Sequence, residues 1–269
     1  SGGLDSRAVV AALGELGVAL HTSNMSDEGS QDFVFGAQIA KALGCHHKQV
    51  EPVQDPVSGR YSKREVMDWL KSEVISIAPP TRHGLMWGGD GGSVGMGHVY
   101  LTRKMVELAR SGHRDEAVAE FLSHNSIAVP SRVLNPKFAG KLSGVLSEGV
   151  LAELDRLSCS DAGRGLHLFL MFNDQRRHLA GIYENIDIDR IELELPFFDA
   201  RFIEIVLSLS LDSCLRHIFY MQWLEQFAPI VLNTPWQAYP EHVPCPLAVP
   251  KDLSYQWSRE KGQEAKQAR

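Results

Sequence analysis

Helical and strand-like hydrophobic patterns alternate over residues 1–112. Apolar positions at helical spacing predict three helices, and short apolar runs between them predict strands. In chain order these are a helix that ends near Gly17, a strand at Val18–Thr22, a helix at Gln31–Leu43, a strand at Cys45–Val50, a helix at Lys63–Ile77 and a strand at Gly84–Trp87. Such alternation is typical of parallel strands joined by crossover helices. We therefore predict an α/β fold with a mainly parallel sheet flanked by helices.

The pattern changes in the second half of the chain. Residues 113–212 show mostly helical spacing, and residues 113–269 are expected to be the helical C-terminal part of the same domain. Five prolines follow Asn233 and predict an irregular segment, and the polar end Ser258–Arg269 is expected to fray. The sequence starts without Met, directly before the first helix, so we expect that a strand precedes Ser1 and that the chain is part of a longer protein.

Composition narrows the functional classes. Hydrophobic residues make up 44% and charged residues 22%, as in ordinary globular proteins, and the net charge of −6 gives no basic surface for nucleic acid. Apolar runs fall short of the ~18 residues of a membrane span. Four scattered cysteines lack a C-x-x-C pair, which argues against a zinc site or a disulfide framework. We expect a cytoplasmic protein that binds neither nucleic acid nor membrane.

The first six residues, Ser1–Ser6, carry the strongest chemical signal. Gly2 and Gly3 can present backbone N–H groups at the start of a helix, where the helix dipole favours an anion. Ser1 and Ser6 add hydroxyl donors, and the Asp5 carboxylate suits Mg²⁺. The alternative is a tight turn before an ordinary helix.

Ser1–Ser6 resembles the pyrophosphate-binding loop of the PP-loop ATP pyrophosphatases. Three further segments resemble the C-terminal synthetase domain of asparagine synthetases in order and approximate spacing: Ser26–Val50, the glycine-rich run Gly88–Gly97, and Glu194–Glu204 with its Pro196-Phe197-Phe198 core. The resemblance implies an adenine nucleotide α-hydrolase-like fold, with residues 1–112 as the nucleotide-binding core. It also implies ATP and Mg²⁺ as cofactors.

The resemblance assigns roles to individual residues. Asp5 would bind the metal, Asp90 would act near the amine nucleophile, and Arg216 and His217 lie where the family has a lysine that stabilises departing pyrophosphate. Ser93 replaces a second acidic metal ligand of the family, which weakens the metal site. The residues expected to hold ATP and pyrophosphate are Ser1, Gly2, Gly3, Leu4, Asp5, Ser6, Gly89 and Gly91.

The resemblance implies an ATP-dependent ligase that adenylates a small-molecule or peptide carboxylate and forms an amide. A glutaminase domain or subunit upstream of Ser1 would supply nitrogen. The alternative is a non-catalytic ATP-binding or scaffold protein of the same fold, favoured by the departures at Ser93 and Arg216. A sulfonucleotide reductase is a third reading, but it requires a reactive cysteine near the C-terminus, and Cys245 between two prolines suits that role poorly.

Overall fold

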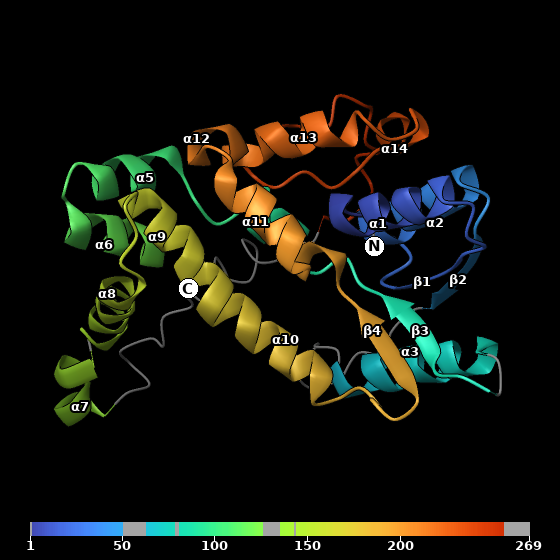
Figure 1. Cartoon of the computed structure of the whole chain (residues 1–269), viewed down its shortest axis with the longest axis horizontal. Coiled ribbons are helices and arrows are strands. Elements are labelled where there is room, and N and C mark those ends of the chain that lie inside the picture. The colour runs from blue at the N-terminus through green and yellow to red at the C-terminus, as the bar shows by residue number, and fades with distance from the viewer. Residues whose placement is uncertain (1, 51–62, 79–80, 126–134, 143, 256–269) are drawn as a thin grey trace.

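The structure is a computed structural model that describes residues 2–50, 63–78, 81–125, 135–142 and 144–255 (Figure 1). The expected role of Ser1 and the expected fraying of Ser258–Arg269 lie outside the described residues. Figure 1 shows the strands at one end of the molecule, the helices of residues 103–169 at the other, and α10 (Arg176–Tyr183) running between the two ends.

Helices and strands alternate in the N-terminal part, as the hydrophobic pattern predicts. The elements are α1 (Leu4–Glu15), β1 (His21–Met25), α2 (Gln31–Ala42), β2 (His46–Val50), α3 (Lys63–Ile77) and β3 (Gly84–Trp87). The bounds of α3 and β3 match the prediction. The first strand instead begins at His21, because the Val18 N–H still bonds to the Leu13 carbonyl at the helix end.

The strands form two separate parallel pairs rather than the one continuous sheet that we predicted. β1 pairs with β2, from His21 opposite His46 to Met25 opposite Val50. β3 pairs with β4 (Ile191–Glu194), a strand inside the region expected to be helical. Its alternation of apolar residues with Glu192 and Glu194 is a strand signal that the helical interpretation overlooked.

The rest of the described chain is helical up to Asn233. Its elements are α4 (Gly92–Gly95), α5 (Arg103–Arg110), α6 (Arg114–Asn125), α7 (Pro136–Leu142), α8 (Val145–Leu157), α9 (Ala162–Phe169), the π-helix η2 (Leu170–Gln175), α10 (Arg176–Tyr183), the 3₁₀ turn η3 (Pro196–Phe198), α11 (Ala200–Ser208), α12 (Leu211–Cys214), the 3₁₀ turn η4 (Leu215–His217), α13 (Ile218–Leu224) and α14 (Ile230–Asn233). After Asn233 the described residues contain no further helix or strand, which confirms the predicted irregular segment.

Two hydrophobic cores meet at the segment that follows β3. One core packs α1 against α13, α14 and the irregular segment, around Leu4, Tyr220 and Trp236. The other packs α5, α6 and α9. Val94 belongs to the second core and Met96 to the first, so the glycine-rich segment is anchored on both sides.

No helix in the described part of the chain combines the length and apolar character that a membrane crossing requires. All four cysteines are free thiols.

Candidate functional site

The two glycine-rich segments meet at the amino end of α1. A Cβ atom at Gly89 would lie 2.5 Å from the Ser6 backbone nitrogen, and one at Gly92 would lie 2.8 Å from Asp5 Cγ. Gly91 has φ of +90° and packs against the Phe198 ring. Because such approaches exclude side chains, glycine is required here on steric grounds. The segment after β3 therefore forms a backbone wall beside the first turn of α1.

The amino end of α1 keeps the features of an anion site. Its N-cap is Gly3, which has no side chain to accept from the first-turn N–H groups. Leu4 is buried in the core, so only its backbone could contact an anion. The Gly2 N–H is instead bonded to Asp32 Oδ1 at 2.8 Å, a partner that the sequence did not suggest. The candidate cradle is therefore narrower than predicted and runs from Gly3 to Ser6.

Asp5 lies at the centre of a hydrogen-bond network. Its Oδ1 accepts from Ser93 Oγ and from Tyr220 OH, each at 2.7 Å, and its Oδ2 accepts from the Ser93 N–H at 2.9 Å. Burial raises the pKa of Asp5, whereas the bonds from Tyr220 and Ser93 lower it. Ser93 thus acts as a donor that holds Asp5 in place.

This arrangement does not suit Asp5 as a Mg²⁺ ligand. Three hydrogen bonds occupy most of the lone-pair positions of the carboxylate, so only one position, on Oδ2, is left for a metal. The described residues also hold no cluster of three His, Cys, Asp or Glu side chains that could bind a metal. The geometry therefore gives no support to the predicted role of Asp5 as a metal ligand.

Asp90 is the accessible carboxylate of the site. Its side chain is 34% exposed, and its Oδ1 lies 3.0 Å from Nε2 of His178 on α10. The sequence analysis did not pair His178 with Asp90. A carboxylate held by an imidazole beside a phosphate cradle can accept a proton during a reaction.

Arg216 and His217 take left-handed backbone conformations, with φ of 60° and 64°. The Arg216 guanidinium is exposed and donates through Nε to the Glu241 carbonyl, on the irregular segment. His217 is buried with its ring stacked on Tyr220 and Tyr239. Burial, with a smaller contribution from His242, lowers its pKa to about 3, so the ring is neutral at pH 7. His217 therefore cannot serve as the predicted cation.

Arg7 is a buried cation that the sequence analysis missed. Its guanidinium donates to the carbonyls of Val231, Thr234 and Pro235 at 2.7, 2.6 and 2.7 Å. Burial lowers its pKa to about 10, so it stays charged at pH 7. The hydrogen bonds of Arg7 thus hold the start of the irregular segment against α1.

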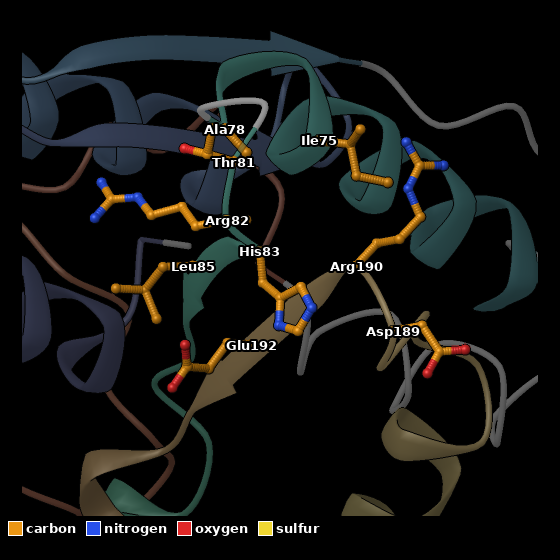
Figure 2. Close-up of a pocket in the computed structure, with 10 residues that line it drawn as sticks. Ile75, Ala78, Thr81, Arg82, His83, Leu85, Asp189, Arg190 and Glu192 are labelled. Atoms are coloured by element: carbon orange, nitrogen blue, oxygen red, sulfur yellow. The ribbon is translucent and has the colours of Figure 1, made fainter.

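A large cavity lies elsewhere. It has a volume of about 680 Å³ and lies at the amino ends of β3 and β4 (Figure 2). Figure 2 shows Arg82 and Arg190 extending away from each other, with His83 between them. The two cations do not converge on one point, and chemistry in parallel sheets is usually found at the carboxyl ends of the strands. We therefore place the candidate site at the glycine-rich segments.

The chain matches neither a known family model nor a curated protein. The functional argument therefore depends on the site itself.

Proposed function

We propose that the chain is the synthetase part of an ATP-dependent ligase that adenylates a carboxylate and then forms an amide. The observation that carries the proposal is the convergence of two glycine-rich segments on the amino end of α1, with the Asp90–His178 pair beside them. The finer fold that we propose is the PP-loop fold, in which the β1–β2 and β3–β4 pairs would belong to one parallel sheet.

The residues of the chain fit a nucleotide better than a metal. Backbone N–H groups from Gly3 to Ser6 lie at a helix amino end, so the β- and γ-phosphates of ATP can be bound there. Mg²⁺ would arrive with ATP and neutralise phosphate charge. We assign it no protein ligand and no reaction step.

In the first reaction, a carboxylate oxygen of the substrate attacks the α-phosphorus of ATP. The bond to the β-phosphate oxygen breaks, and pyrophosphate leaves into the cradle at α1. In the second reaction, an amine attacks the acyl carbon and AMP leaves. The proton lost by the amine goes to Asp90, and His178 orients that carboxylate.

The proposal is tested by release of AMP and pyrophosphate from ATP in the presence of a carboxylate panel and ammonia. We expect Asp90→Asn to slow amide formation by about 10²–10⁴-fold, the usual contribution of a general base. Asp189→Asn, an exposed aspartate before β4, is the matched control and should leave the rate unchanged. Equal rates for the two variants would remove Asp90 from the mechanism.

A second function, non-catalytic ATP binding, is favoured by two specific observations. Ser93 and Tyr220 occupy most of the lone-pair positions of Asp5, and His217 is neutral at the place of the family lysine. Such a protein would bind ATP without releasing AMP. If Ser93→Asp created activity where the unaltered chain has none, the scaffold function would be the correct one.

A further inference from the structure

An apolar pocket of about 280 Å³ lies between two helical segments. The run from α9 through η2 to α10 forms one side, and η3 with α11 forms the other. Apolar side chains dominate its lining, among them Leu168, Met171, Phe202, Ile203 and Val206. The volume is at the lower end of the range of small-molecule sites. The π-helix η2 forms part of the wall, and π-helical turns are frequent at functional sites.

The pocket shares a wall with the candidate site. Phe197 and Phe198 line the pocket and also pack against the glycine-rich segment, since a Cβ at Gly92 would lie 2.9 Å from the Phe197 ring and one at Gly91 would strike Phe198. Arg176 lines the pocket, and His178, two residues further along α10, bonds to Asp90. Positions two apart on an α-helix face opposite sides, so the pocket is linked to the candidate site through the shared Phe197–Phe198 wall.

The buried end of the pocket is lined by a neutral histidine. The Arg164 guanidinium donates to His167 Nδ1 at 3.2 Å and to His98 Nε2 at 3.1 Å. Because a guanidinium only donates, His167 Nδ1 must accept and its proton resides on Nε2. The pKa of His167 is lowered to about 4 by burial and Arg164, which keeps the ring neutral. Its Nε2 has no partner among the described residues and is buried.

The outer end of the pocket carries a cation. Arg176 is exposed, and no hydrogen bond or ion pair joins its side chain to another described residue. A guanidinium at the rim of an apolar pocket suits a carboxylate, which it can bind through two parallel hydrogen bonds. The polar groups thus lie at opposite ends of an apolar wall.

We propose that this pocket selects the carboxylate substrate and that the substrate has an apolar chain. Arg176 holds the carboxylate at the rim, and the chain lies against Ile203 and Val206. This inference rests on the proposed function and names its substrate class, an aliphatic carboxylic acid in place of aspartate.

Binding is measured first without ATP, by calorimetric titration of hexanoate, 5-oxohexanoate and aspartate into the full chain. We expect hexanoate to bind at least tenfold more tightly than aspartate. 5-Oxohexanoate, whose ketone oxygen would lie unpaired against the apolar lining, should bind more weakly than hexanoate. Arg176→Gln should weaken hexanoate at least tenfold, while Arg177→Gln, the neighbouring exposed arginine, should change it less than twofold.

A second pair of variants tests the pocket itself. Ile203→Trp fills it and should abolish hexanoate binding, whereas Ile205→Trp, at a position 61% exposed on the same helix, should not. Circular dichroism checks that both variants fold. If Ile203→Trp does not fold, the pocket assignment is tested by Arg176→Gln and Arg177→Gln alone. Aspartate binding as tightly as hexanoate, or equal behaviour within each folded pair, would overturn the pocket assignment.

The two proposals fail in different ways. Hexanoate binding with the expected variant pattern but no AMP release from ATP would support the pocket and overturn the ligase function. AMP release with aspartate, combined with no binding of hexanoate, would support the ligase function and overturn the pocket.

Discussion

Lowering the pH from 7 to 5 charges the histidines of an unfolded chain but leaves three rings of the folded chain neutral. His98, His167 and His217 are 0%, 1% and 2% exposed. Burial is the largest cause that lowers the pKa of each ring, to about 4 for His167, to about 3 for His217 and well below the ordinary value for His98. An unfolded histidine has a pKa of about 6.5.

The sign of the effect follows from proton binding. Between pH 6.5 and the lowered pKa values, the unfolded state binds more protons than the folded state, so the free energy of unfolding falls as the pH falls. At pH 5 the loss is about 2 kcal/mol for each ring with a pKa of about 4 or below. His167 and His217 together then cost about 4 kcal/mol, and His98 adds to the loss. Asp5, with its raised pKa, opposes the loss once the pH nears that pKa.

Urea denaturation followed by circular dichroism at pH 7, 6 and 5 measures this loss. His217→Gln should reduce the difference between pH 7 and 5 by about 2 kcal/mol, because one linked proton is removed. His113→Gln, at an exposed site, is the control and should leave the difference unchanged. A change below about 1 kcal/mol between pH 7 and 5 in the unaltered chain would refute the reasoning.

Three further changes test the packing around the cradle. Tyr220→Phe removes a donor to Asp5 and should lower the free energy of unfolding, measured by urea denaturation, by about 1.5–3 kcal/mol. A double-mutant cycle with Asp5→Asn that gives a coupling energy near zero would contradict this hydrogen bond. Arg7→Met leaves carbonyls of the irregular segment unpaired and should cost about 3 kcal/mol or more, with faster proteolysis after residue 234. An unchanged cleavage rate would show that the Arg7 hydrogen bonds do not hold the irregular segment in place. Gly14→Ala, with open space around its Cβ in α1, should raise the free energy of unfolding by about 0.4–1 kcal/mol, and a loss would show that the site is not open.

Local patterns predicted local structure well. The helix over Lys63–Ile77 and the strand over Gly84–Trp87 have the predicted bounds, because hydrophobic spacing and turn residues act within a few residues. The strand β4 was missed, since a four-residue strand becomes stable only by pairing with β3, about a hundred residues earlier in the chain. The division into two parallel pairs depends equally on non-local pairing.

In the candidate site, too, local features were predicted from the sequence and non-local contacts were not. The glycine-rich segments were found because the sequence itself marks them. The partners Tyr220, His178 and Arg7 were not, because their contacts join residues 88 to 227 positions apart. Arg7 did leave a signal, since it lies beside Leu4, Ala8 and Ala11 on the buried face of α1, where a charge requires an explanation.

Calorimetric titration of MgATP into the full chain tests the central claim most directly, with Gly89→Ala and Gly14→Ala as the matched pair of variants. The account predicts one ATP site, lost or strongly weakened in Gly89→Ala because the new Cβ would lie 2.5 Å from the Ser6 nitrogen, and unchanged in Gly14→Ala. No binding to the unaltered chain at millimolar ATP, or equal binding to both folded variants, would contradict a nucleotide cradle between the glycine-rich segments.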